Sequence, residues 1–192
     1  MNYPFKKEIS NNRVTQYGKR GMTLESDINI SNNYYLNNDI AIIYKKPTPI
    51  RVVKVDYNKR INTKITEAYY EIPSTTDYNG IYKGKYIDFE AKETKSKTSF
   101  SLNNIHKHQI LHLKRINDHG GISFLIIRFT SLDKTYLLTT DAFLNYINNN
   151  DRKSIPIKYI EENGYIINNG YNPIVDYIKI IDILLGDNNN ER

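Results

Sequence analysis

The segment 86–92 limits the possible folds of this chain more than any other stretch, because its side chains alternate strictly in character. It reads Tyr-Ile-Asp-Phe-Glu-Ala-Lys, and successive side chains of a β-strand point to opposite faces. The pattern therefore predicts a strand with Ile87, Phe89 and Ala91 in a core and with two acids and a lysine on the other face. Such alternation is also typical of any half-buried strand, so a function for the charged face needs support from its surroundings.

The remaining periodicities place this strand in a mixed sheet. Leu24, Ile28 and Tyr35 fall on one helical face. Thr23 precedes them and can cap the helix at its N-terminus. Alternating strands and helices predict an α/β fold, a mixed β-sheet flanked by helices. Turns are expected at 78–80 and 83–85, further strands at 41–44, 122–129 and 136–138, and further helices at 102–118, 141–147, 157–161 and 175–185.

The length of 192 residues suits one compact domain. We expect this domain at 21–186, with a flexible polar arm at 1–20 and a polar tail at 187–192. The chain has no cysteine, which excludes disulfides, thiolate metal sites and cysteine nucleophiles. No apolar stretch suits a secretory signal or a membrane span. A soluble, cytoplasmic protein without a membrane partner is therefore expected.

Positive charge is concentrated between residues 45 and 64. Pro47 and Pro49 force an extended entry, and two β-branched runs follow around a turn at 58–59. A β-ribbon with this charge has little to bury on at least one face, which favours a projecting β-hairpin stalk at about 46–70. The alternative is an ordinary solvated edge hairpin whose lysines discourage edge pairing. This stretch contains one acid and seven basic residues, which gives a local charge of +6. The basic residues are Lys45, Lys46, Arg51, Lys54, Lys59, Arg60 and Lys64.

The net charge of the whole chain is only weak support for a nucleic-acid partner. A formal charge of +6 and a pI near 9.2 suit nucleic acid or an anionic membrane surface. The chain is, however, rich in Asn, Ile, Lys and Tyr, whose codons are rich in A and T. The clustering of charge in the predicted stalk is therefore the stronger indication of DNA binding.

Three charged residues around the 86–92 strand match a catalytic pattern. Asp77 stands thirteen residues before Glu90, with a short predicted hairpin between them, and Lys92 follows Glu90 by two. An acid, a hairpin and then acid-x-Lys on a strand is the PD-(D/E)-x-K pattern of restriction-endonuclease-like nucleases. The spacing alone is a weak signal, because many unrelated proteins share it.

The chemistry of phosphodiester hydrolysis explains these residue types. Mg²⁺ prefers oxygen ligands in octahedral geometry and keeps several waters. Two carboxylates from adjacent strands can hold it and leave positions for a phosphate oxygen and a hydrolytic water. The ammonium of Lys92 projects from the same face, where it can orient the nucleophile and offset the charge that grows on the phosphorane.

Neighbouring polar residues fit the same site. Thr75 and Thr76 precede Asp77 and can add an oxygen ligand or a water contact, although turn chemistry explains them equally well. Gln109 lies within the apolar stripe of the helix predicted at 102–118, where an amide is costly unless it is hydrogen-bonded. If that stripe faces the sheet, Gln109 reaches toward the carboxylates. The alternative is a satisfied core amide.

The histidines of this helix carry less information. His112 falls near the same edge and is interpreted as structural rather than as a base. A zinc site with His106 and His108 is disfavoured, because residues two apart point to different faces of a helix.

Several runs of the sequence together resemble one known family. The similarity is to the RecU Holliday-junction resolvases of low-GC Gram-positive bacteria and their mycoplasma relatives, and it extends over about 18–182. The block at 73–102 is long enough to be highly specific. The runs are GKRGMTLE (18–25), KKPTPI (45–50), PSTTDYNGIYKGKYIDFEAKETKSKTSFSL (73–102), HQI (108–110), GGISFLI (120–126) and GYNPIVDYIKIID (170–182).

The resemblance implies a homodimer with a restriction-endonuclease-like core and a protruding β-stalk that inserts at the centre of a four-way DNA junction. It implies symmetric nicks with 5′-phosphate products, made with Mg²⁺ or Mn²⁺ during homologous recombination and DNA repair. It also implies association with the nucleoid and contacts with a recombinase or a branch-migration helicase. The arm at 1–20 is shorter and less basic than the Arg-rich extension that many members use to contact the recombinase.

The resemblance also implies roles for individual residues. Asp77 and Glu90 match the metal-binding carboxylates, and Lys92 matches the catalytic lysine. Thr75 and Gln109 match further positions of that active site, which makes them candidate metal ligands and gives Gln109 a candidate part in catalysis. Lys45 and Arg60, at the foot and the tip of the predicted stalk, match basic positions that the family uses to bind and process the junction.

Two other functions remain open. A duplex-specific restriction-type endonuclease would share the core chemistry but should read a particular sequence. A non-catalytic junction-binding protein would need only the basic stalk. The presence of both acids and the lysine disfavours this second alternative.

Overall fold

The structure, a computed structural model, describes residues 23–56, 63–71 and 75–186. The predicted arm, tail and stalk turn lie outside these residues, as do Lys59 and Arg60. None of the described helices is both long enough and apolar enough to cross a membrane. In chain order the elements are α1 (Leu24–Asn37), β1 (Ile42–Lys45), β2 (Ile50–Asp56), β3 (Lys64–Tyr70), β4 (Tyr78–Tyr82), β5 (Lys85–Thr94), β6 (Ser99–Ser101), the 3₁₀ turn η1 (Leu102–Asn104), α2 (Lys107–Asp118), β7 (Ile122–Phe129), β8 (Lys134–Thr139), α3 (Thr140–Asn149), β9 (Ser154–Pro156), α4 (Ile157–Asn163), β10 (Tyr165–Ile167) and α5 (Ile178–Leu184).

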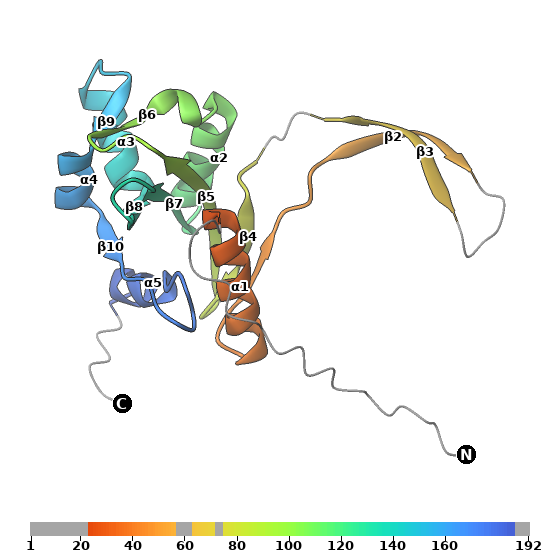
Figure 1. The fold of residues 1–192 in the computed structure, drawn as a ribbon, viewed down its shortest axis with the longest axis horizontal. Coiled ribbons are helices and arrows are strands. Elements are labelled where there is room, and N and C mark those ends of the chain that lie inside the picture. Colours follow the sequence, from red (N-terminus) through yellow and green to blue (C-terminus); the bar gives the residue numbers. More distant parts are fainter. Residues whose placement is uncertain (1–22, 57–62, 72–74, 187–192) are drawn as a thin grey trace.

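Six strands form one mixed sheet in the order β1-β4-β5-β7-β8-β10 (Figure 1). β5 and β7 run parallel, and the other neighbouring pairs are antiparallel. A parallel pair needs a crossover connection, which α2 supplies between β5 and β7. The predicted mixed sheet flanked by helices is therefore confirmed.

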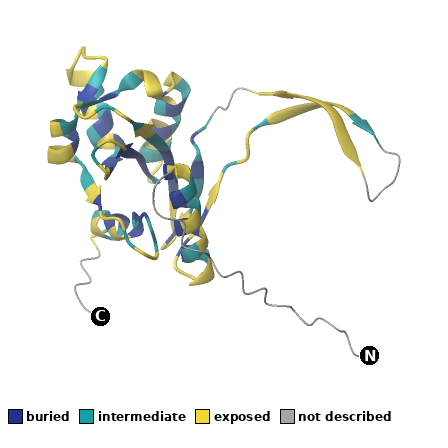
Figure 2. Ribbon diagram, viewed as in Figure 1, coloured by how far each residue is buried: buried dark blue, intermediate teal, exposed yellow. Residues whose placement is uncertain are grey.

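Helices on both faces of the sheet create two hydrophobic cores. α1 and α5 pack on one face, where Ile28 and Phe89 are fully buried. α2, α3 and α4 pack on the other, where Leu113 and Phe143 are fully buried. Figure 2 shows the buried residues gathered along the strands and on the helix faces turned toward them. Because side chains alternate along a strand, Glu90 on β5 faces the α2 side.

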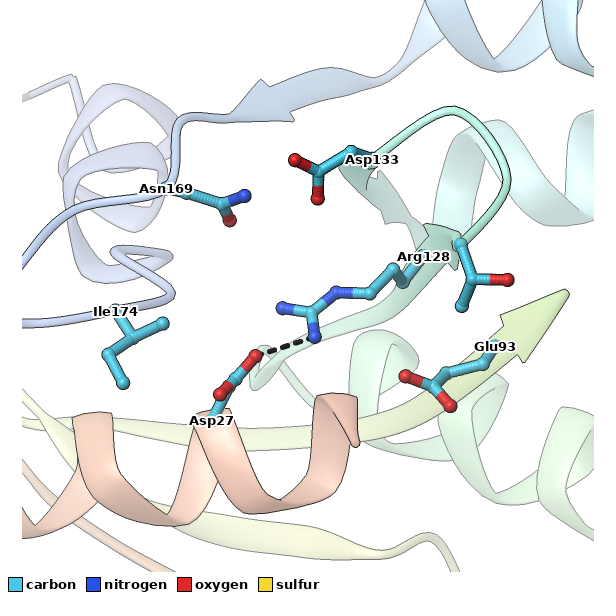
Figure 3. Close-up of a pocket in the computed structure, with 7 residues that line it drawn as sticks. Asp27, Glu93, Arg128, Asp133, Asn169 and Ile174 are labelled. Carbon is cyan, nitrogen blue, oxygen red and sulfur yellow. Dashed lines mark hydrogen bonds and ion pairs between the residues drawn. The ribbon is translucent and has the colours of Figure 1, made fainter. Parts of the chain in front are cut away.

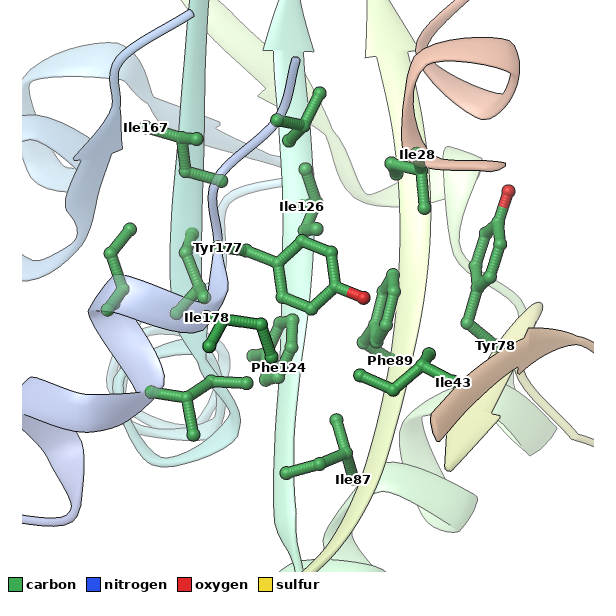
Figure 4. Packing of buried hydrophobic residues seen from close by; sticks show 14 of the residues in the cluster. Ile28, Ile43, Tyr78, Ile87, Phe89, Phe124, Ile126, Ile167, Tyr177 and Ile178 are labelled. Atoms are coloured by element: carbon green, nitrogen blue, oxygen red, sulfur yellow. The ribbon is translucent and has the colours of Figure 1, made fainter. Parts of the chain in front are cut away.

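An aromatic stack joins the strands at the centre of the first core (Figure 4). The Phe89 ring lies nearly parallel to the rings of Tyr78 and Phe124, with centroids 4.8 Å away in each case. Tyr177 packs against Phe89 with its ring centroid 5.1 Å away. Buried aromatic pairs contribute beyond their area alone, so this stack stabilises β4, β5 and β7 as neighbours.

β2 and β3, which we name the basic ribbon, form a separate two-stranded antiparallel sheet. The ribbon extends away from the six-stranded sheet (Figure 1), and none of its residues is buried. Arg51 and Lys54 are exposed, and so are apolar side chains such as Val53 and Tyr70. The ribbon therefore presents both charge and apolar surface to solvent.

A cavity of about 240 Å³ lies on the α1 side of the sheet (Figure 3). Arg128 of β7 lines it and donates to Asp27 of α1 at 2.6 Å and to Thr135 at 3.1 Å. Glu93 accepts a hydrogen bond of 2.7 Å from the backbone N–H of Leu24. These contacts hold α1 on the sheet, so the charged lining of the cavity has a structural role.

The predicted turn at 78–80 is wrong, because these residues begin β4. A Cβ atom on Gly80 would lie 2.0 Å from the carbonyl oxygen of Ile42. Glycine at this position therefore lets the backbones of β1 and β4 approach each other. The turn falls at Lys83 and Gly84, where φ is positive at 46° and 73°, within the turn predicted at 83–85.

Two predicted helices begin later than expected. The helix predicted from residue 102 starts at Lys107, after a 3₁₀ turn and an extended Ile105 whose side chain is buried in the second core. The helix predicted from residue 175 starts at Ile178. Val175 instead forms a β-bridge with Asn169, and its N–H donates to a serine of α1.

Candidate active site

The two predicted metal-binding carboxylates meet where β4 begins. Tyr78 pairs with Phe89 across β4 and β5, so the preceding residue, Asp77, lies next to Glu90. The backbone N–H of Asp77 donates to Glu90 Oε2 at 3.1 Å. The structure therefore brings together two acids that are thirteen residues apart in the sequence.

Lys92 and Gln109 converge on the other carboxylate oxygen of Glu90. Lys92, on the same face of β5, forms an ion pair with Glu90 Oε1. Gln109 Nε2 donates to this oxygen at 2.7 Å, and Gln109 Oε1 accepts from the backbone N–H of His106 at 3.0 Å. Gln109 reaches the carboxylates as predicted, although it does so from the first turn of α2 rather than from the middle of a longer helix.

Glu90 is an unusual carboxylate, because its side chain is fully buried. Burial raises the pKa of Glu90 to about 7, and the neighbouring negative charge of Asp77 adds to this shift, whereas Lys92 opposes it. A cation close to both acids would therefore favour their charged forms. This is the electrostatic environment expected of a metal site.

The donor atoms around Glu90 also fit a hard divalent cation. No group of three or more His, Cys, Asp or Glu side chains in the described ranges is arranged to hold a metal. The oxygens at hand are the carboxylates of Asp77 and Glu90. Gln109, predicted as a metal ligand, turns its amide nitrogen toward Glu90, and its Oε1 accepts from the backbone N–H of His106, so it is a hydrogen-bond donor to Glu90 in this structure. Thr75, two residues before Asp77, is half-buried. Mg²⁺ is commonly held by one or two carboxylates and several waters, so this small set is sufficient.

We expect the raised pKa of Glu90 to make the metal-free protein less stable as the pH rises from about 4.5 to about 7. In this window the unfolded chain loses the proton that the folded protein retains, so deprotonation favours unfolding. Between pH 5 and pH 8 this should lower the free energy of unfolding by on the order of 2–3 kcal/mol. Urea unfolding at pH 5 and pH 8, with chelator present, should show this loss in the wild type and not in Glu90→Gln. Identical pH profiles for the two proteins would contradict the assignment.

Asp88 is the centre of a cluster that the sequence did not predict. Its fully buried carboxylate contacts Lys46 Nζ at 2.8 Å, the Tyr86 hydroxyl at 3.0 Å and His112 Nε2 at 3.1 Å. The hydroxyl of Thr76 donates to its other oxygen. Alternation along β5 had placed Asp88 on the Glu90 face, but no local pattern could indicate a partner 42 residues away.

The predicted DNA-binding residues lie in different settings. Arg51 and Lys54 are exposed on the basic ribbon. Lys45 is also exposed and pairs with Glu25 of α1. Lys46 differs, because its ammonium is mostly buried against Asp88.

Comparisons with known proteins point to one family. The family model described as RecU, recombination protein U, matches residues 19–183. A protein of Staphylococcus epidermidis (strain RP62A) named Holliday junction resolvase RecU is 50% identical over 207 residues, covering 100% of both chains. Proteins with the same name from Geobacillus kaustophilus and Bacillus cereus (strain B4264) are 50% and 54% identical, over 95% and 88% of this chain and 96% and 86% of their own.

Proposed function

This chain belongs to the RecU family, and we propose that it is a Mg²⁺-dependent endonuclease that resolves four-way DNA junctions in recombination and repair. The observation that carries the proposal is the convergence of Asp77, Lys92 and Gln109 on the buried carboxylate of Glu90. The full-length identity to proteins named Holliday junction resolvase supports the choice of substrate. The sheet with its covering helices supports a restriction-endonuclease-like core.

In the proposed reaction, Asp77 and Glu90 hold Mg²⁺, with Thr75 as a further oxygen donor. Mn²⁺ can substitute for it. When bound, the metal polarises the scissile phosphate and lowers the pKa of a water. The ammonium of Lys92 orients the attacking water and offsets the negative charge that develops on the phosphate. Gln109 holds the Glu90 carboxylate in place, and in-line displacement leaves a 5′-phosphate and a 3′-hydroxyl.

The basic ribbon is the proposed stalk that enters the open centre of the junction. Its exposed cations neutralise phosphates, and its shape selects a branched substrate over a linear one. Lys45 at the foot of the ribbon extends the basic surface. Lys59 and Arg60, which the sequence predicts to bind DNA, lie outside the residues that the structure describes. Affinity gained in this way depends strongly on salt, because each neutralised phosphate releases counterions.

We expect the double variant Arg51→Ala/Lys54→Ala to bind junctions with a shallower dependence on salt. Each lost phosphate contact should reduce the slope of log K against log salt by roughly 0.9, so two should reduce it by about 2. Fluorescence anisotropy over a salt series measures the slope. The matched control is Lys134→Ala on β8, whose ammonium pairs with Glu161 at 3.0 Å. An unchanged slope in the double variant would argue against the ribbon as a DNA-binding surface.

The proposed active form is a homodimer, because a four-way junction has two-fold pseudo-symmetry and needs two cuts. The edge strand β1 supports self-association, since it exposes Ile42 and Tyr44 beside Ile81 of β4. Exposed apolar side chains on an edge strand favour contact with another chain.

A single cleavage experiment tests the proposal. A mobile four-way junction and its separate duplex arms are incubated with the protein, with and without Mg²⁺, and light scattering measures the mass of the same sample. We expect metal-dependent, paired nicks in the junction alone and a mass twice that of the 22.5 kDa chain. Cutting of the duplex arms at a fixed sequence would favour a restriction-type enzyme. Tight binding without any nick would favour a non-catalytic junction-binding protein.

A further inference from the structure

Asp88 connects segments that are far apart in the sequence. The donors on its carboxylate come from Lys46, from Thr76, from Tyr86 on β5 and from His112 on α2. Lys46 Nζ also donates to the Thr76 hydroxyl at 2.9 Å. One fully buried carboxylate is thus bonded to three segments other than its own strand.

Two of these donors lie in the segments that connect the basic ribbon to the six-stranded sheet. Lys46 immediately follows β1, where the chain leaves the six-stranded sheet toward β2. Thr76 immediately precedes Asp77, where the chain has returned from β3 and is about to enter β4. The ribbon therefore leaves and rejoins the sheet at the same buried carboxylate. We call Lys46 and Thr76 the two roots of the ribbon, and we name Lys46, Thr76 and Asp88 together the root clamp.

The root clamp is continuous with the proposed catalytic carboxylates. Asp77 follows Thr76 directly, and its carbonyl oxygen accepts from the backbone N–H of Lys46 at 2.8 Å. The N–H of Asp77 donates to Glu90, and Asp88 is two residues before Glu90 on the same face of β5. A displacement of either root would therefore shift the backbone of Asp77.

The chemistry of the root clamp also indicates a positioning role. A buried ion pair contributes little net stability compared with well-packed apolar side chains, but it fixes its partners in direction. Charge-assisted hydrogen bonds of this kind are short and directional. Lys46 has only 16% of its side chain exposed, so its ammonium serves Asp88 and Thr76 rather than open solvent.

We propose that Asp88 and Lys46 are positioning residues that fix the roots of the basic ribbon relative to Asp77 and Glu90. This inference rests on the proposed function, in which the ribbon occupies the junction centre. The root clamp then sets the distance between the junction centre and the phosphate that is cut. It thereby determines which phosphate is cut, as well as how fast.

The experiment maps cleavage positions at single-nucleotide resolution on a junction with a fixed crossover, where only the enzyme sets the position. The variants are Asp88→Asn, Lys46→Met and the milder Thr76→Val, which removes one hydroxyl. Lys134→Met is the control for the loss of a lysine charge. We expect the wild type and the control to cut one principal phosphate per strand. The variants should cut several neighbouring phosphates, with a total rate about 10- to 100-fold lower.

The distribution of cuts separates positioning from simple destabilisation. A variant that is only less stable has fewer active molecules, but each of them cuts at the wild-type position. Lys46→Arg retains the cation and should restore the narrow distribution in part. If Asp88→Asn does not fold, Lys46→Met and Thr76→Val carry the test.

An unchanged distribution in the folded variants overturns the root clamp and leaves the proposed function intact. A wild-type protein that leaves junctions uncut overturns the proposed function and this inference with it.

Discussion

The Glu90→Gln variant is expected to cut four-way junctions on the order of 10³-fold more slowly than the wild type, while it binds them at least as tightly. Glutamine retains the shape of the side chain and removes the negative charge that Mg²⁺ needs. It also leaves Lys92 without its carboxylate partner. Binding should be preserved, because in the proposed function DNA affinity comes from basic side chains elsewhere, and one repulsive charge near the phosphate is lost. Single-turnover cleavage and anisotropy measure the two effects separately.

The same strand offers a matched control for this variant. Glu93 lies three residues further along β5, on the opposite face, where its carboxylate accepts from the N–H of Leu24. Glu93→Gln retains an acceptor there and should cleave at the wild-type rate. If Glu90→Gln cut within about tenfold of Glu93→Gln in Mg²⁺, the carboxylate would not be a metal ligand of the reaction.

Truncation of Phe89 to alanine should lower the free energy of unfolding by about 3–5 kcal/mol. Phe89 is fully buried between the rings of Tyr78 and Phe124 and against Tyr177, so its loss leaves a cavity in contact with three aromatic side chains. That is a large part of the stability of a typical domain. Urea unfolding followed by circular dichroism measures the change, with the midpoint shifted and the slope retained.

Phe89→Leu is the graded control, because it retains most of the apolar volume and should cost only about 1–2 kcal/mol. A Phe89→Ala protein as stable as Phe89→Leu would show that the stack collapses around the truncated side chain. The stack would then contribute little to holding β4, β5 and β7 together.

Local periodicity predicted those elements that carry their own pattern. The helix capped by Thr23 and the strand at 86–92 both follow from the spacing of apolar side chains over at least two repeats. The same alternation placed Glu90 and Lys92 on one face, and the PD-(D/E)-x-K spacing added Asp77. These residues form the candidate site in the structure.

Features that depend on distant partners were not predictable in this way. The strands β6, β9 and β10 have three residues each, too few for a period to emerge. Gly80 suggested a turn, but its role depends on the backbone of β1 passing close by. The partnership between Lys46 and Asp88 arises only after the chain has left the sheet and returned, so no local window contains it.

The two faces of β5 have a consequence for the mutational tolerance of this strand. Ile87 and Phe89 are buried in the core with α1, whereas Asp88 and Glu90 belong to the polar cluster on the α2 side. If the proposed function holds, substitutions at adjacent positions of β5 should affect different properties of the protein, folding stability on one face and catalytic rate on the other. In a saturation screen of 86–92, substitutions at positions 87, 89 and 91 should chiefly reduce the yield of folded protein. Conservative substitutions at positions 88, 90 and 92 should instead impair turnover in the protein that folds.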